Sequence, residues 1–324
     1  MTDYDIVRVE RRMTPEEATT LVGSYVPELD ANVTSGTVFV DVKTDEPVLA
    51  YLPVPDKADL RRAVLNIPYG HTSRSNGIQN KSRTFGYAPR KPVHGRDGCR
   101  QTHLADLCPA EHSTLEEWAN RLADMLEEIS PGIAKRDRET MDAVLPDWKM
   151  GESSLWTSGV VNRSSQLPYH RDGFNFPTWS AMPVLRRHMS GGFLSVPEYD
   201  IVTQCRDGYA VFFPGHQLVH GVTPMTPTQA DGYRFSVVYY ALKGMKDCFT
   251  HAVETAHAKA KRTEREREMA ARARRGEADP ESPWVKAFHR GVGKHGITVA
   301  PSYVEDTDMD PHAEYAAEQA ERES

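Results

Sequence analysis

The spacing of apolar residues changes near residue 155, and the change divides the chain into two patterns. Before this point, stretches with helical spacing alternate with short β-branched runs. Residues 114–129 repeat Leu, Trp, Met and Ile at helical intervals, which predicts a helix with one face packed on a core. Residues 37–42 and 47–52 are apolar runs separated by four polar residues, which predicts a β-hairpin.

Two further helices and one long loop are predicted in this first part. Thr14-Pro15-Glu16-Glu17 is a helix start, with a threonine cap, a proline at the first position and a glutamate placed for a capping box. Residues 56–66 also have a helical pattern. Residues 68–112 are rich in Gly, Pro, Asn, Arg and His, which predicts a loop whose length is typical of a functional or a disordered segment.

Short strands with Gly and Pro turns follow residue 155, which predicts an α+β chain with a β-sandwich or barrel in its second half. After Lys243 the chain becomes helical and highly charged. No internal repeat is present. The predicted strands are residues 155–162, 191–199, 208–215, 218–223 and 233–242.

Composition limits the class of protein. The hydrophobic fraction is 39% and the charged fraction 26%, as in globular proteins, and no apolar run is long enough for a membrane-spanning helix. The first residues lack the basic and apolar segments of a secretory signal, so we expect a cytoplasmic protein without a membrane partner. The four cysteines are far apart and form no CxxC pair, so we expect a reducing compartment, no disulfide partner and no thiolate metal site.

The net charge of −7 comes from the end of the chain. Residues 305–324 contain eight acids and one arginine, and the other 304 residues balance at 38 against 38. Residues 71–100 carry a local charge of +6 and residues 259–275 one of +5. Either segment could contact phosphates, or could be an ordinary solvated loop and an ordinary exposed helix. The total charge therefore does not exclude a nucleic-acid substrate.

His170 and Asp172 form an HxD pair whose side chains would share one face of a strand. A second histidine would complete a two-histidine, one-carboxylate site, which leaves coordination positions open on a non-haem Fe(II) ion. His220 lies within an apolar strand, whereas His216 follows Pro-Gly and is typical of a turn. We therefore expect His220 as the third ligand, with His216 as the alternative.

Arg234 and Ser236 form an RxS pair fourteen residues after His220. A guanidinium on an inward strand face is costly unless it is paired, and its fork geometry fits a carboxylate. A dicarboxylate co-substrate would satisfy it, with the serine hydroxyl as a further donor. The alternative is a salt bridge to a buried acid.

These motifs resemble the Fe(II)/2-oxoglutarate dioxygenases, and more narrowly their TET/JBP branch, which oxidises the methyl group of 5-methylpyrimidines in DNA. The resemblance covers roughly residues 70–245 and implies a double-stranded β-helix (jelly-roll or cupin-like) core with flanking helices. It implies Fe(II) on His170, Asp172 and His220, and 2-oxoglutarate on Arg234 and Ser236. It also implies dioxygen as co-substrate, with ascorbate as an aid in vitro. The matching segments are HRDGFN (170–175), GGFLSVP (191–197), HGV (220–222) and RFSVVYY (234–240).

The same resemblance implies substrate contacts to a target base flipped out of DNA. Asn175 matches a position that contacts the base, and Tyr240 an aromatic on which the base stacks. A loop brace and core packing are their respective alternatives. Leu242 stands where the animal enzymes have a base-contacting histidine, which leaves cytosine or thymine open as the target. Arg74 and Arg83 are candidates to reach the co-substrate or a phosphate, or are solvated loop arginines.

The leading hypothesis is thus a dioxygenase that converts 5-methylcytosine in DNA to 5-hydroxymethylcytosine. The alternatives are hydroxylation of thymine in DNA, of a protein side chain or of a small metabolite, and an inert β-barrel binding module. We expect an N-terminal α/β part of the catalytic unit, a dioxygenase core, a charged helical extension and an acidic, disordered tail. Their boundaries are residues 1–69, 70–245, 246–304 and 305–324.

Overall fold

A computed structural model describes residues 4–73, 79–91, 96–152 and 155–277 of the chain. The described residues fall into two compact units, one drawn from residues 1–88 and 101–246 and the other from residues 89–100 and 247–324. The expected acidic tail, 305–324, lies outside the described residues.

A large sheet lies at the centre of the first unit. Its strand order is β1-β2-β3-β13-β9-β16-β7-β5-β4, with β6 paired to β5. Along this order β1 and β2 are parallel, and the pairings from β2 to β4 are antiparallel. The predicted hairpin is confirmed as β2 and β3. The strands are β1 (Asp5–Val9), β2 (Thr37–Asp41), β3 (Pro47–Pro53), β4 (Gly70–Ser73), β5 (Gln79–Ala88), β6 (Arg100–Gln101), β7 (Ser158–Arg163), β9 (Ser180–Arg187), β13 (Tyr209–Phe213) and β16 (Tyr233–Tyr240).

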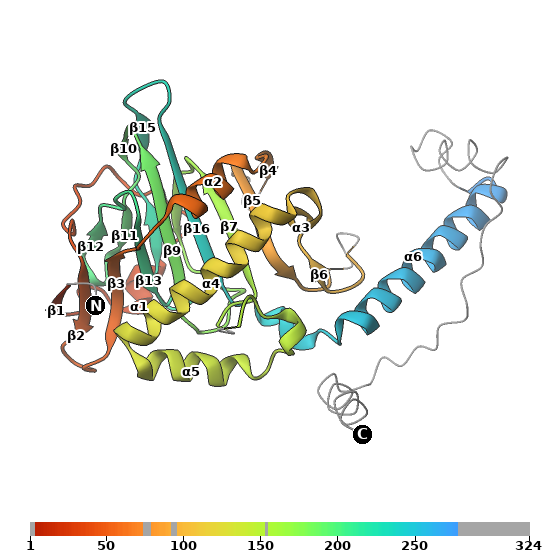
Figure 1. Cartoon of the computed structure of the whole chain (residues 1–324), viewed down its shortest axis with the longest axis horizontal. Coiled ribbons are helices and arrows are strands. Elements are labelled where there is room, and N and C mark those ends of the chain that lie inside the picture. The colour runs from red at the N-terminus through yellow and green to blue at the C-terminus, as the bar shows by residue number, and fades with distance from the viewer. Residues whose placement is uncertain (1–3, 74–78, 92–95, 153–154, 278–324) are drawn as a thin grey trace. The chain divides into compact units, whose positions relative to one another are not determined.

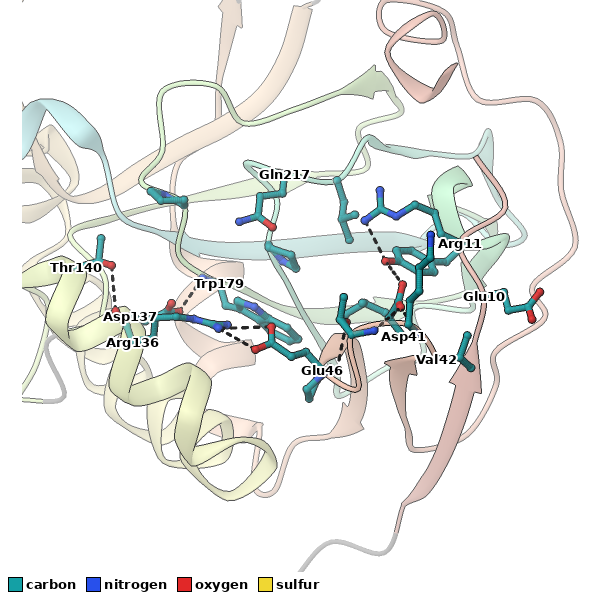
Figure 2. A pocket seen from close by; sticks show the side chains of 18 residues that line it. Glu10, Arg11, Asp41, Val42, Glu46, Arg136, Asp137, Thr140, Trp179 and Gln217 are labelled. Atoms are coloured by element: carbon teal, nitrogen blue, oxygen red, sulfur yellow. Dashed lines mark hydrogen bonds and ion pairs between the residues drawn. The ribbon is translucent and has the colours of Figure 1, made fainter. Parts of the chain in front are cut away.

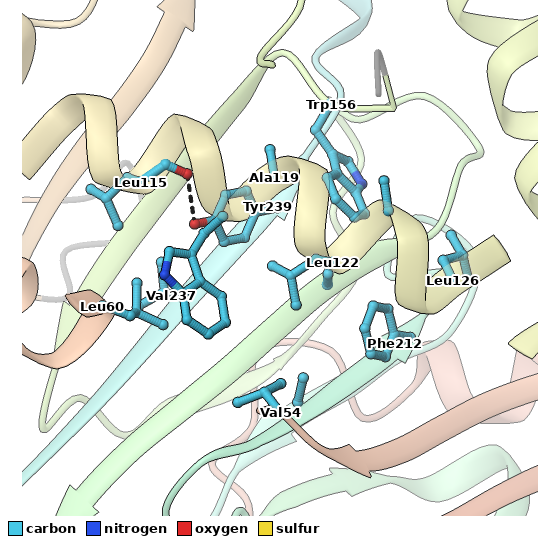
Figure 3. Close-up of a cluster of buried hydrophobic side chains, with 14 of the residues drawn as sticks. Val54, Leu60, Leu115, Ala119, Leu122, Leu126, Trp156, Phe212, Val237 and Tyr239 are labelled. Carbon is cyan, nitrogen blue, oxygen red and sulfur yellow. Dashed lines mark hydrogen bonds between the residues drawn. The ribbon is translucent and has the colours of Figure 1, made fainter. Parts of the chain in front are cut away.

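Helices α2 (Ala58–Asn66), α4 (Pro109–Ile129) and α5 (Pro131–Met141) lie on one face of this sheet (Figure 1). The apolar stripe of α4 packs against side chains of β16 and β13, as Figure 3 shows. Tyr239 on β16 is fully buried there, and its hydroxyl donates to the Leu115 carbonyl at 2.9 Å. The helix predicted at 114–129 is therefore confirmed, and it begins five residues earlier.

The other face of the large sheet packs on a small antiparallel sheet of order β12-β11-β14-β8. Val184 and Val211 of the large sheet share one buried cluster with Leu194 and Val222 of the small sheet. Two sheets enclosing one core, with helices outside, make this an α+β fold with a double-stranded β-helix core, which confirms the expected fold class. The strands of the small sheet are β8 (Leu167–His170), β11 (Leu194–Val196), β12 (Ile201–Thr203) and β14 (His220–Val222).

The remaining short elements are connections. Thr14 caps α1 with the predicted capping box, in which its hydroxyl accepts from the Glu17 amide and the Glu17 carboxylate accepts from the Thr14 amide. These short elements are α1 (Pro15–Thr19), α3 (His103–Leu107), β10 (Met189–Gly191), β15 (Met225–Pro227), η2 (Pro146–Trp148), η3 (Pro197–Tyr199) and η4 (Lys243–Asp247).

The expected loop at 68–112 is wrong. Strands β4 and β5 extend the large sheet, and α3 and the start of α4 follow them. β5 has the polar sequence QNKSRTFGYA, so it lacks an alternating apolar pattern. It forms a strand because β7 supplies a continuous ladder and Phe85 inserts into the core under the helices.

The second unit contains α6 (His251–Arg274), which matches the predicted charged helix. Cys99 and Cys248 form a disulfide within this unit, so the expectation of no disulfide partner is wrong. Their separation of 149 residues left no spacing motif in the sequence. In the part of the chain that the structure describes, no helix has the length and apolar composition needed to cross a membrane.

Candidate metal centre and anion site

Three potential metal ligands converge at the edge of the small sheet. His170 is the last residue of β8, Asp172 follows it by two residues, and His220 is the first residue of β14. The antiparallel register pairs His170 directly with His220, and their ring centroids lie 4.3 Å apart. Ligand atoms of all three residues lie within 4.8 Å of one another.

Their donor chemistry fits Fe(II). The Asp172 carboxylate approaches the Nε2 atoms of His170 and His220 at 3.7 and 3.9 Å. Two imidazole nitrogens and one carboxylate form the facial set that leaves positions open on a non-haem iron. A Cβ at Gly215 would lie 2.8 Å from Asp172 Oδ2, so the glycine leaves the space that this carboxylate occupies.

Backbone carbonyls orient both imidazoles. His170 Nδ1 lies 2.8 Å from the Pro168 carbonyl, and His220 Nδ1 lies 3.0 Å from the Leu218 carbonyl. A carbonyl can only accept, so each Nδ1 carries the hydrogen and each Nε2 keeps its lone pair for a metal. Burial, with a smaller effect from His170, lowers the pKa of His220 to about 4, which keeps this ring neutral near pH 7.

His216, the alternative third ligand, faces away from this cluster. Its Nδ1 lies 3.2 Å from the Asp172 backbone carbonyl, and its Nε2 lies 3.4 Å from Lys243 Nζ. The structure therefore brings together the preferred set of His170, Asp172 and His220.

Arg234 and Ser236 face the space between the two sheets. Ser236 is paired with Val184, which belongs to the core between the sheets, and Arg234 points to the same side of β16. The Arg234 side chain is 1% exposed, and its Nε and Nη2 atoms have no hydrogen-bond partner among the described residues. Unpaired donors on a buried guanidinium are costly, so these two atoms are available to hold an anion. A carboxylate matches their fork geometry.

Two neighbours of Arg234 support an anion site. Arg186 lies opposite it on β9, is half-buried and donates to four backbone carbonyls, so a second cation lies beside Arg234. Burial, with a smaller effect from Arg234, lowers the pKa of Arg186. Gly192, at φ +70°, covers Arg234, because a Cβ there would lie 2.9 Å from Arg234 Cδ. The second glycine of the GGFLSVP segment thus allows backbone to approach the arginine.

Glu198 links the two segments that carry the metal ligands, and the sequence did not indicate it. This glutamate is fully buried, and its Oε1 accepts from the Val219 amide at 2.8 Å, next to His220. The same oxygen lies 3.4 Å from Nη2 of Arg171, the residue between His170 and Asp172. An acid two residues after the strand 194–196 was the signal that could have identified it.

Asn175 and Tyr240 lie beside these groups. The Asn175 amide donates to the Asp172 carbonyl, and Asn175 forms a bridge with Leu242 just beyond β16. Tyr240 shares the strand face of Arg234 and Ser236 and is half-buried.

Arg83 is not brought to the site. Register pairs it with Val161, whose partner Val237 belongs to the core under the helices, so Arg83 lies on the opposite sheet face from Arg234. Its Nε and Nη2 donate to the Pro68 carbonyl. Arg74 lies outside the described residues.

A cavity of about 850 Å³ is lined in part by the turn that precedes His220 (Figure 2). Pro214, Gln217 and Leu218 of this turn line it, but none of the three metal ligands does. Asp137 lies in its wall, where burial raises the pKa of this carboxyl to about 6 although the carboxylate accepts from the Trp179 amide. The cavity is therefore separate from the metal centre.

Comparisons with known proteins give the following. No family model matches the chain, and no curated protein does. Among solved structures, NgTET1 in complex with 5mC DNA has 15% identity and a TM-score of 0.49, over 72% of this chain and 93% of that one. An oxidoreductase of the 2OG-Fe(II) oxygenase family from Burkholderia pseudomallei has 14% identity and a TM-score of 0.41, over 60% and 88%. OsALKBH1 has 12% identity and a TM-score of 0.36, over 60% and 98%.

Proposed function

We propose that this chain is an Fe(II)- and 2-oxoglutarate-dependent dioxygenase that hydroxylates the methyl group of 5-methylcytosine in DNA to 5-hydroxymethylcytosine. The observation that carries the enzyme class is the pairing of a His-Asp-His cluster with a buried arginine whose donors lack partners. A structural metal site would not require this arginine. A salt-bridged arginine would have an acid beside it.

Each residue has a defined role in this proposal. His170, Asp172 and His220 hold Fe(II), and Arg234, with Ser236, binds the distal carboxylate of 2-oxoglutarate through Nε and Nη2. When bound, iron and 2-oxoglutarate supply the oxidising chemistry with dioxygen, yielding succinate and carbon dioxide. The protein orients the ligands, excludes water from the arginine and positions the methyl group.

Resemblance to the TET/JBP branch supports DNA as the substrate class. The buried Asn175 lies beside the metal ligands, and Tyr240 lies on the strand face that carries Arg234. A base must leave the duplex to reach groups recessed between two sheets, and it then needs a stacking surface and polar edge contacts. Tyr240 and Asn175 offer these two contacts. Leu242 offers no polar contact to the edge of the base, so cytosine or thymine could occupy the site.

The test is direct. The protein is incubated with Fe(II), 2-oxoglutarate, ascorbate and DNA methylated at cytosine, and nucleosides are analysed by mass spectrometry. We expect 5-hydroxymethylcytosine, abolished in the His170→Ala/Asp172→Ala variant. Succinate without a changed nucleoside would move the function to a protein side chain or metabolite, and oxidised thymine would change the target base. Absence of both iron binding and succinate would refute the enzyme class.

Arg234→Gln tests the anion site separately. We expect 2-oxoglutarate affinity to fall by roughly 100-fold in calorimetry, since a charge-assisted bidentate contact is removed. Arg187→Gln on the same sheet is the matched control, because Arg187 is largely exposed and pairs with Asp231 at 3.1 Å. Equal affinity in the two variants would assign Arg234 a structural role.

A further inference from the structure

Phe174 is the most exposed large hydrophobic side chain in the part of the chain that the structure describes, at 85%. It lies two residues after Asp172, on the turn that follows β8. A Cβ on the adjacent Gly173 would meet nothing within 4 Å, so open space surrounds this turn. Isolated exposed apolar side chains are common on proteins, so exposure alone assigns no role.

The backbone around Phe174 is fixed on both sides. The Asp172 amide donates to the Gly215 carbonyl and the Asn175 amide to the Asp172 carbonyl, both at 3.0 Å. Beyond the ring, the Lys243 amide donates to the Phe174 carbonyl at 3.0 Å. The aromatic ring is therefore presented to solvent on a restrained turn, which lowers the entropy lost when a partner contacts it.

Positive charge lies next to this ring. Lys243 Nζ is 3.5 Å from the Gly173 carbonyl and 3.4 Å from His216 Nε2. Lys246 follows in the same 3-10 segment and is exposed. A restrained aromatic ring beside lysines is the combination by which proteins hold unpaired nucleic-acid strands, stacking on bases and neutralising phosphates.

We propose that Phe174 stacks on a base of the DNA strand next to the flipped target, and that Lys243 and Lys246 contact the flanking phosphates. This inference rests on the function proposed above. Two residues of extended chain span at most about 7 Å, and stacked bases in a strand are about 3.4 Å apart. Phe174 is therefore close enough to Asp172 to contact a nucleotide that flanks a target base held at the metal ligands.

Binding of the metal-loaded protein to a fluorescent oligonucleotide with one 5-methylcytosine, measured by anisotropy without oxygen, tests this role. We expect Phe174→Ala and Phe174→Leu to raise Kd by roughly 5- to 150-fold, and Phe174→Trp to stay near wild type, since stacking needs an aromatic ring. Tyr25→Ala is the matched control, because Tyr25 is 58% exposed elsewhere on the same unit. Lys243→Gln should lower the salt dependence of binding by about one phosphate contact.

The outcomes separate this inference from the proposed function. If wild-type protein oxidises methylated DNA but Phe174→Ala binds within twofold of wild type, the stacking role is overturned and the function stands. If Phe174→Leu binds as well as Phe174→Trp, the contact is apolar and not base stacking, which also overturns it. If wild-type protein neither binds nor oxidises methylated DNA, both are overturned.

Discussion

Glu198→Gln isolates what holds the two metal-binding segments together. The substitution keeps the shape of the side chain and an oxygen for the Val219 amide, but it removes the charge that faces Arg171 at 3.4 Å. Hydrogen bonds to charged groups contribute about 1.5–3 kcal/mol, and Arg171 is 24% exposed, so water recovers part of this. We expect the free energy of unfolding to fall by about 1–2 kcal/mol. For a unit of this size the melting temperature would fall by roughly 2–8 °C.

Metal binding should weaken as well. Glu198 contacts the neighbours of all three ligands and none of the ligands themselves, so its loss relaxes their mutual placement. Groups that orient ligands typically contribute 10- to 100-fold in metal affinity. We expect the lower end, roughly 10-fold, with Co(II) as a spectroscopic probe in competition with a chelator. A changed Co(II) spectrum would show that the ligand geometry itself has moved.

Glu46→Gln is the matched control. Glu46 pairs with Arg136 at 3.2 Å, but both side chains are more than half exposed, so the loss of this pair should cost less than about 1 kcal/mol. It should leave Co(II) affinity unchanged. If Glu198→Gln and Glu46→Gln bind Co(II) with equal affinity, then Glu198 stabilises the fold only, and the positioning argument is refuted.

Three further predictions follow from the structure. Gly192→Ala should weaken 2-oxoglutarate binding by roughly 10-fold or more in calorimetry, because the added Cβ would meet Arg234 at 2.9 Å and φ is +70°. Gly173→Ala is the control, because open space surrounds its Cβ, and a similar loss of affinity in both variants would contradict the argument. Asp137→Asn should raise the free energy of unfolding at pH 7.5 by about 1–3 kcal/mol. The pKa of Asp137 in the folded protein, about 6, exceeds its unfolded value, so the stability that this carboxyl contributes below pH 3.8 is lost as the pH rises through 6. Urea unfolding at pH 4 and 7.5 tests it, and an equal effect at both would count against it. Alkylation of the denatured, unreduced protein should label two of the four cysteines, and labelling of all four would disprove the disulfide.

Motif spacing predicted which side chains the strands bring together. The first and third residues of HxD and of RxS lie on one strand face, because successive side chains of a β-strand point to opposite faces. This holds whatever fold surrounds the strand. The pairing of His170 with His220 depends on the register of β8 with β14, which the sequence could indicate only through the resemblance. Similarly, Thr14 and Glu17 define a helix start through local hydrogen bonds alone.

Features that depend on distant partners were not predictable. The central strand β9 contains Pro183, and a proline argues against a strand because it has no amide hydrogen. The pairing of β9 with β16 covers residues 184–187 and then Ala181, so it skips the proline. β5 is polar and derives its structure from β7. The helix α5 is different, because it begins with a local start signal, Ser130-Pro131, as clear as Thr14-Pro15. Since α4 ends at Ile129, apolar spacing alone does not separate the two helices.

The two halves of the proposed site belong to different sheets. The metal ligands are carried by β8, β14 and the turn after β8, whereas Arg234 and Ser236 are carried by β16 of the large sheet. No hydrogen bond among the described residues joins a metal ligand to Arg234, so their separation is set by the apolar core between the sheets. Val184 lies in that core directly opposite Ser236, and Val222 lies two residues after His220. A co-substrate with one end at the metal and the other at the arginine would therefore fit only if this core holds the two sheets at the right separation. Once bound, it would link the two sheets.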